Sequence, residues 1–185
     1  MNPQDEVIRL HECLLVVQAQ QKDVSAFSEL VAMYERRLLY YLHRIVGESQ
    51  AALDLLQDVW LTVYQRLSGL HSPETFRVWL YRIAHDRAVT IVRRQRREHD
   101  VLVQLAEEQE ETWDEPCIYE AAELVHWALG QLSVPHREVL TLRFLEDLSV
   151  EQIAVVIGSP LATARSRLFH AKRAMRALIE EFKHA

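Results

Sequence analysis

The chain has 185 residues, 49% of them hydrophobic, which is enough for one core or for two small ones. Nine scattered histidines and two cysteines, Cys13 and Cys117, form no metal-ligand or redox spacing, so we expect no metal, no cofactor and a reducing compartment. No nucleophile–base pair indicates an enzyme, and without a signal peptide or a membrane-length apolar run the protein is expected to be cytoplasmic. Four glycines, five prolines and few β-branched alternations predict an all-α fold.

Four helices are predicted in the first half of the chain, over residues 5–20, 24–46, about 49–67 and about 76–97. The first has Val7, Leu10, Leu14 and Val17 on one side, and Cys13 among them is most simply a buried thiol. Asp23 is expected to cap the second helix and Gly47 to end it, because these residue types satisfy the unpaired groups at helix ends.

The third and fourth predicted helices carry charged faces. On the third, Asp54, Gln57 and Asp58 stand together at helical spacing, apart from its apolar positions. The fourth has seven arginines between Arg77 and Arg97 and a single acid, Asp86. Between the two helices, Ser68–Thr75 contains Gly and Pro and is predicted to be a loop.

An acidic stretch divides the chain. Residues 98–123 contain ten acids and neither Lys nor Arg, and without these acids the formal net charge of −6 would become +4. The stretch has no clear apolar period, so residues 98–118 are predicted to be a flexible linker, with a possible helical turn at 101–108.

The last third of the chain has the pattern of a helix-turn-helix. A helix over 119–132 precedes helices from near Pro135 to about Leu145 and over 149–157, the latter with a capping box of Ser149 and Gln152. Gly158 then gives a tight turn, Ser159 is expected to cap the final helix, and Pro160 suits its first position. The final helix has an apolar stripe of Leu161, Ala164, Leu168, Ala171, Met175 and Leu178.

The opposite side of the final helix is basic and is the candidate recognition face. Such a helix is often only a solvated surface helix, but the capped helix and the turn before it favour DNA binding. Arg165 could pair with guanine, Ser166 with either base, and Phe169 could touch a thymine methyl group or merely shield the helix edge. The full candidate set is Thr163, Arg165, Ser166, Phe169, His170, Lys172 and Arg173.

Four segments in order resemble bacterial RNA polymerase sigma factors of the extracytoplasmic-function (ECF) class. Residues 76–84 (FRVWLYRIA) resemble the F-x-x-W-L-x-x-I-A signature, and residues 52–59 (ALDLLQDV) resemble the A-E-D-L-x-Q-E-x helix. Residues 132–140 (LSVPHREVL) with Leu142, Arg143, Leu148 and Ser149 resemble the opening of the fourth sigma region, and residues 163–168 (TARSRL) resemble its end. Any one motif is weak, whereas four in register are specific.

The resemblance implies three parts. Residues 1–97 would be a region 2 domain that binds the clamp coiled coil of polymerase and opens the −10 element. Residues 98–118 would be a linker in the polymerase channel, where 107–115 would mimic phosphate. Residues 119–185 would be a region 4 domain that sits on the β flap and reads the −35 element. An anti-sigma factor is a further expected partner.

The resemblance also assigns residues. Asp54, Gln57 and Asp58 would meet polymerase. The loop would capture a flipped base, with His71 stacking and Ser72 and Thr75 hydrogen-bonding, although it could simply join two helices. Trp79 is expected in the core. The set expected at the −10 element is His71, Ser72, Thr75, Arg77, Arg82, Asp86, Arg93 and Arg94.

Three positions depart from the family pattern: Leu53 replaces an acid, Asp86 replaces Asn, and His170 stands where relatives often have Arg. Asp86 either pairs with Arg82 four residues earlier or accepts a hydrogen bond from cytosine. Two other classes of protein remain possible: a helix-turn-helix regulator that binds DNA without polymerase, and a helical adaptor that binds only proteins.

Overall fold

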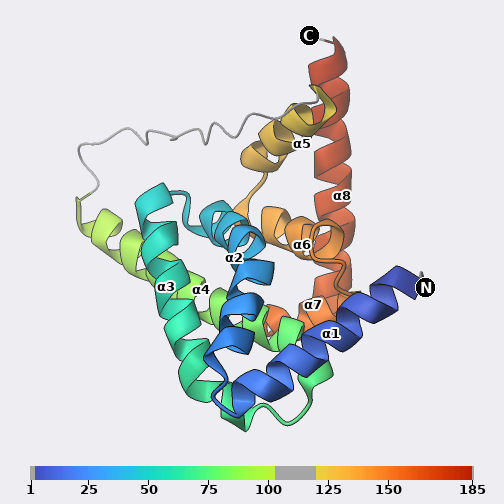
Figure 1. Ribbon diagram of the computed structural model, residues 1–185. Helices are drawn as coiled ribbons and strands as arrows, with labels where there is room; N and C mark the ends of the chain where they lie inside the picture. The colour runs from blue at the N-terminus through green and yellow to red at the C-terminus, as the bar shows by residue number, and fades with distance from the viewer. Residues whose placement is uncertain (1–2, 103–119, 185) are drawn as a thin grey trace.

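The computed structural model describes residues 3–102 and 120–184, and its regular structure is helical throughout these ranges (Figure 1), which confirms the all-α prediction. The acidic segment 103–119, including the proposed phosphate mimic at 107–115, lies outside the described residues, as do Cys117 and most of the possible turn at 101–108. The helices are α1 (Pro3–Gln20), α2 (Val24–Val46), α3 (Ser49–Arg66), α4 (Phe76–Leu102), α5 (Glu120–Gln131), α6 (Val134–Phe144), α7 (Val150–Val156) and α8 (Leu161–His184).

The predicted helix ends in the first half follow from local capping chemistry. The Asp23 carboxylate accepts hydrogen bonds from the backbone N–H groups of Ser25 and Ala26, and Gly47 ends α2 at φ 81°. The loop between α3 and α4 contains two short 3₁₀ turns, η1 (Leu67–Gly69) and η2 (Pro73–Thr75). Helix α4 extends to Leu102, five residues beyond Arg97.

Helix α1 does not pack through the apolar side that the sequence predicts. Val7, Leu10, Leu14 and Val17 are 40–66% exposed, whereas the adjacent face, with Leu15, Val16 and Ala19, enters the core. The prediction of a buried Cys13 thiol is therefore wrong, because Cys13 stands beside the outward stripe and is only half-buried. The inward face is fixed by polar contacts: Tyr34 donates to Glu12 (2.6 Å), and Gln20 donates to the carbonyls of Leu67 and Leu70.

The C-terminal helices are organised by the predicted turn. Ser149 and Gln152 form both hydrogen bonds of the capping box at α7, and Gly158 adopts φ 60°. Helix α8 begins one residue later than expected: the Pro160 carbonyl accepts the first helical hydrogen bond, from Ala164, and the Ser159 hydroxyl donates to the Ile157 carbonyl at 3.5 Å. The predicted stripe of α8 is buried or half-buried along its length.

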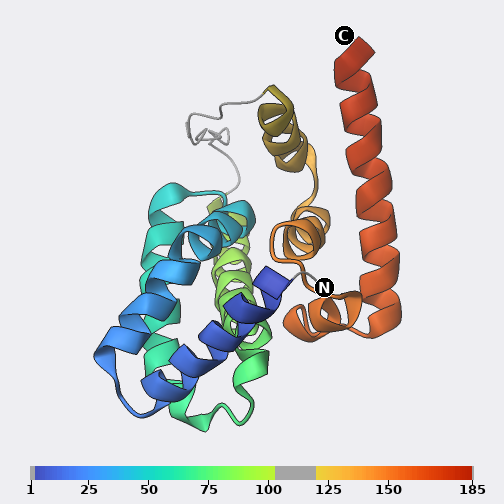
Figure 2. The same cartoon turned by 45° about the vertical axis from the view of Figure 1, so that its right-hand side comes forward.

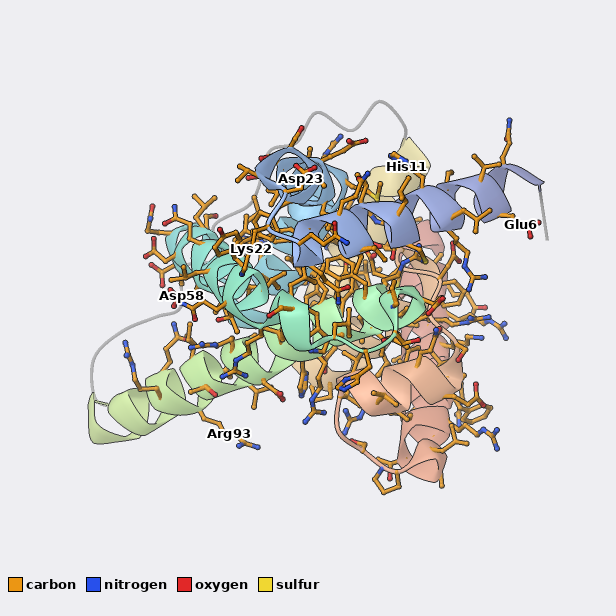
Figure 3. The ribbon with its side chains drawn as sticks, turned by 60° about the horizontal axis from the view of Figure 1, so that its bottom comes forward. Glu6, His11, Lys22, Asp23, Asp58 and Arg93 are labelled. Atoms are coloured by element: carbon orange, nitrogen blue, oxygen red, sulfur yellow. The ribbon has the colours of Figure 1, made fainter. Side chains whose placement is uncertain are left out.

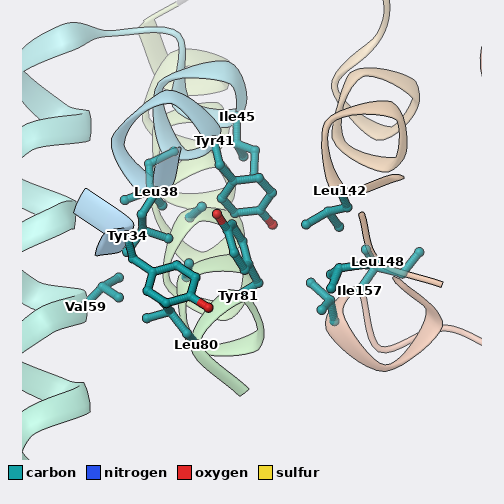
Figure 4. Close-up of a cluster of buried hydrophobic side chains, with 14 of the residues drawn as sticks. Tyr34, Leu38, Tyr41, Ile45, Val59, Leu80, Tyr81, Leu142, Leu148 and Ile157 are labelled. Carbon is teal, nitrogen blue, oxygen red and sulfur yellow. The ribbon is translucent and has the colours of Figure 1, made fainter. Parts of the chain in front are cut away.

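Helices α1–α4 (the N-terminal unit) and α5–α8 (the C-terminal unit) pack directly against each other through α2 with α6 and through α4 with α7. Figure 4 shows Tyr41 and Tyr81 of the N-terminal unit facing Leu142, Leu148 and Ile157 of the C-terminal unit. All five side chains are at most 7% exposed and belong to one hydrophobic cluster. Among the described helices, none is apolar over a length that could cross a membrane.

Candidate nucleic-acid interface

Helix α8 presents its candidate recognition face to solvent. Ala164, Leu168 and Ala171 on one side are at most 6% exposed, which fixes the rotation of the helix and turns the opposite side outward. Figure 2 shows α8 on the far side of the C-terminal unit from α1–α4. The members of the set are all exposed, as predicted: Thr163, Arg165, Ser166, Phe169, His170, Lys172 and Arg173.

The three Lys and Arg side chains of this set already have neighbours within the protein. Arg165 pairs with Glu151 of α7 at 3.2 Å, in an exposed ion pair that is worth little in water. The Arg173 guanidinium lies 6.0 Å from the centre of the Phe169 ring, so the two lie on the same face. Lys172 instead lies over the ring of Phe144 of α6 (5.3 Å), at the edge of the recognition face.

The basic face of α4 is only partly exposed. Arg93 and Arg94 are exposed, and Figure 3 shows Arg93 projecting from the outer part of the helix. Arg82 donates from Nε to the Asp86 carboxylate at 3.0 Å, so the i,i+4 pair, one of the two alternatives for Asp86, is present in the structure. Arg77 and Arg82 also reach into the C-terminal unit. Trp79 is half-buried against the core, as expected.

The loop residues His71, Ser72 and Thr75 are exposed, but two of their hydroxyl groups are already used within the loop. Ser72 donates to Glu74 (2.7 Å), which holds the pKa of that carboxyl below its usual value, and Thr75 donates to the Ser72 carbonyl (2.7 Å). Of these three side chains, His71 is therefore the one most available to contact a base.

The predicted polymerase patch lies on the outer face of α3. Asp54, Gln57 and Asp58 are exposed, and Figure 3 shows Asp58 pointing away from the helices behind it. Gln50 donates to Asp54 at 3.0 Å. Beside the patch runs a groove of about 390 Å³ whose aromatic lining includes Phe27, Trp60 and Tyr64. An acidic rim next to an apolar groove suits a basic, partly apolar protein partner.

A second apolar groove, not predicted from the sequence, lies between α5, α6 and α8. Its volume is about 710 Å³, and its apolar lining includes Val125, Leu129, Phe144, Met175 and Ile179. Phe144 is 58% exposed and the following Leu145 44% exposed. The feature of the sequence that could have indicated this groove is the pair of apolar residues at the end of α6, beyond the positions needed for the core. The described ranges contain no group of three or more His, Cys, Asp or Glu side chains that could hold a metal ion.

Two family models match the chain in the expected order: Sigma-70 region 2 over residues 30–98 and Sigma-70, region 4 over residues 122–175. The sigma-H factor of Pseudomonas aeruginosa is 35% identical over 173 residues, which cover 87% of this chain and 90% of that protein. The ECF sigma-E factor of Haemophilus influenzae is 30% identical over 176 residues, covering 89% and 93%. The chain belongs to the ECF sigma factors. It therefore directs promoter-specific initiation of transcription by RNA polymerase.

The fold of this sigma factor is also that of solved structures. The sigma factor RpoE of Bartonella quintana, solved in complex with the anti-sigma factor NepR, has a TM-score of 0.73 at 21% identity and covers 85% of this chain and 98% of its own. The candidate −10 and polymerase residues fall within the region 2 match, and the candidate −35 residues within the region 4 match.

Proposed function

We propose that this sigma factor reads the −35 element with the exposed face of α8 and the −10 element with α4 and the loop before it. The observation that carries the proposal is the geometry of α8. A buried stripe fixes one side of this helix, and the capped helix α7 and the Gly158 turn leave Arg165, Ser166 and Phe169 exposed on the other. Side chains at the start of such a helix read base edges in the major groove.

Two surfaces are proposed for polymerase. The acidic patch of Asp54, Gln57 and Asp58 would meet basic residues of the clamp coiled coil, because charged rims guide association and set register. The groove between α5, α6 and α8 would seat an apolar helix of the β flap. Its apolar floor and its rim of Lys172, Arg176 and Glu180 fit an amphipathic helix.

In this proposal, residues 1–97 bind polymerase and the −10 element, and residues 119–185 bind the −35 element. Residues 98–118 form the linker between them. The protein would work in the cytoplasm, where polymerase acts, and by binding alone rather than by catalysis. The solved complex of RpoE of Bartonella quintana with the anti-sigma factor NepR supports a partner of that class for this chain.

The test is transcription in vitro with core polymerase on a library of genomic promoter fragments, with and without the protein. We expect transcripts from a distinct set of promoters only when the protein is present. Tight, sequence-specific DNA binding by the protein alone, without any change in transcription, would instead favour a helix-turn-helix regulator.

A further inference from the structure

One side of α1 is apolar and uncovered. Val7, Leu10, Leu14 and Val17, which we call the outer stripe, are 65%, 66%, 54% and 40% exposed. The other side of α1 packs on α2 and on the turns η1 and η2, and Figure 1 shows the first turns of α1 extending beyond α2, α3 and α4. An exposed apolar patch rimmed by polar residues marks a site of interaction. The outer stripe therefore has the character of a contact surface.

The spacing of the outer stripe is that of a seam between two helices. Its members recur at intervals of three, four and three residues, which is the a/d repeat of a coiled coil. The next position of the repeat is Gln21, which is polar and follows the last residue of α1. The seam thus runs from Val7 to Val17, a length of about 15 Å, and it fits one short amphipathic helix.

The order of residues in the outer stripe points to a second copy of α1 as that helix. The stripe reads Val, Leu, Leu, Val in both directions, and its intervals are also symmetric. When two copies of α1 lie antiparallel about a two-fold axis, Val7 of each copy meets Val17 of the other, and Leu10 meets Leu14. Each layer then joins two side chains of the same kind. A two-fold interface needs such self-complementarity, because the same patch serves both copies.

The residues beside the seam are compatible with this pairing. In the antiparallel arrangement, Glu6 would lie opposite Gln20, and Cys13 and His11 would each lie opposite their counterparts in the second copy. His11 is already paired with Glu29 of its own chain at 2.8 Å. No carboxylate on α1 would therefore face another carboxylate across the seam.

The charge of α1 does not suit a lipid surface. A helix that lies in a membrane interface has Lys and Arg on its polar side, where they meet anionic lipids. Helix α1 has a single basic residue of this kind, Arg9, and three acids, Asp5, Glu6 and Glu12. A protein surface is the better match for the outer stripe.

We propose that the free sigma factor forms an antiparallel, two-fold dimer through the outer stripe of α1. Four apolar side chains from each copy make a small interface, so the dimer is weak, with a dissociation constant of about 10–100 μM. The outer stripe shares no residue with the proposed DNA and polymerase sets, so this inference does not depend on those roles.

The test is sedimentation velocity of the full-length protein without polymerase or DNA, at concentrations from about 1 to 300 μM. Leu10→Glu and Leu14→Lys each place one charge in a Leu–Leu layer, and each should weaken the dimer more than tenfold. An equimolar mixture of the two variants should associate again. The introduced carboxylate then lies opposite the introduced ammonium group, and the other layer, Leu14 with Leu10, is intact.

The mixture also tests the direction of the pairing. In a parallel dimer Leu10 would meet Leu10, and the two introduced charges would not face each other, so mixing would restore nothing. Ile8→Glu is the matched control, because Ile8 is 53% exposed on the same helix but lies off the outer stripe. This variant should dimerise like wild type. All three positions are exposed, so the helical circular dichroism spectrum should be unchanged.

Cross-linking gives a second readout in a Cys117→Ser background. A short bismaleimide should join Cys13 of one copy to Cys13 of the other, because the two thiols would lie beside the same seam. The covalent dimer should disappear in Leu10→Glu and persist in Ile8→Glu.

The proposal is overturned if the wild-type protein remains monomeric at about 300 μM, or if Ile8→Glu weakens association as much as Leu10→Glu. It is also overturned if the mixture associates no better than either variant alone, or if a dimer forms without the Cys13 cross-link. None of these readouts involves polymerase or DNA, so a failure here leaves the proposed function untouched, and a failure in the transcription assay leaves the dimer untouched.

Discussion

The guanidinium of Arg82 occupies the space into which a side chain on Gly158 would project. Any Cβ at Gly158 would collide with Arg82 Nη1, and the positive φ of 60° would strain a non-glycine residue as well. The glycine of the helix-turn-helix thus serves two purposes: it makes the turn before α8, and it lets an arginine of α4 reach the end of α7.

The first prediction separates these purposes. Gly158→Ala should cost about 1–2 kcal/mol for backbone strain. It should cost about 1–3 kcal/mol more for displacing Arg82 from the carbonyls of Val155 and Val156, to which its Nη1 donates. Gly47→Ala is the matched control, because Gly47 also has a positive φ (81°) but no atoms near its missing Cβ. Denaturant unfolding should show the excess at Gly158, and the excess should disappear in an Arg82→Ala background. Equal costs at both glycines would contradict the collision.

The second prediction concerns polymerase binding. Replacing both Asp54 and Asp58 by Arg should abolish binding of core enzyme, because the exposed acidic patch on α3 would become basic. The helical circular dichroism spectrum should not change, since neither side chain is buried. Replacement by Asn should give a partial loss in the same pull-down. Undiminished recovery of core enzyme with the Arg double variant would remove the patch from the interface.

The third prediction concerns the −35 element. Arg165→Ala should cost about 1–3 kcal/mol and relax the preference at one or two base pairs, whereas Lys172→Ala should weaken all sequences alike. The position of Lys172 over Phe144, at the edge of the recognition face, is consistent with the second expectation. Selection of binding sites from a random library with each variant measures both effects. Wild-type base profiles for both variants would mean that the recognition face lies elsewhere on α8.

The fourth prediction concerns Asp86. The Arg82–Asp86 pair is half-exposed and worth about 0.3–0.5 kcal/mol, so Asp86→Asn should bind promoters slightly better through lost repulsion, with the preferred sequence unchanged. A promoter library transcribed with both proteins measures this preference. If the preferred base at the upstream edge of the −10 element moved from cytosine towards adenine, the carboxylate would be a base reader instead.

The fifth prediction concerns pH. Burial raises the pKa of the Glu146 carboxyl above its usual value, against the opposing effects of Tyr81, Arg37 and Arg77. The folded protein therefore holds this proton more tightly than the unfolded chain, and the resulting stability is present below about pH 4.5 and lost as pH rises through the folded pKa. Relative to Glu146→Gln, wild-type protein should gain thermal stability as pH falls from 7.5 to about 4.5. A difference between the two melting temperatures that does not vary with pH would contradict the shift.

The parts of the fold that were predicted correctly depend on local chemistry. Asp23, Gly47 and the Ser149–Gln152 box fix helix ends through atoms a few residues away, and the period of α8 identifies its buried side. The stripe of α1 shows the limit of such patterns. Periodicity finds an apolar side but does not state what covers it, and here Glu12 and Gln20 direct the adjacent side inward.

In the candidate site, too, the sequence predicted the features that depend on a single helix and missed those that depend on contacts between helices. The exposed set on α8 and the patch on α3 follow from helical spacing, because each needs only one helix. The use of Arg77 and Arg82 by the C-terminal unit could not be predicted, because their acceptors are backbone carbonyls, which every residue has. The buried pairing of Tyr41 with Glu138 likewise joins residues 97 positions apart and has no pattern along the chain.

Arg82 donates to main-chain carbonyls of α7, and this matters when C-terminal units are exchanged between sigma factors. Main-chain carbonyls at the end of α7 are present whatever side chains a promoter-reading segment carries, and the glycine after them leaves the space that the Arg82 guanidinium occupies. A hybrid with a foreign segment in place of residues 119–185 should keep the Arg82 contact wherever that segment has the glycine. It would lose the pairing of Glu138 with Tyr41 and of Glu146 with Arg37 unless both acids were transplanted with it. Promoter choice and the strength of the packing between the two units could thus be varied separately in one family of hybrids.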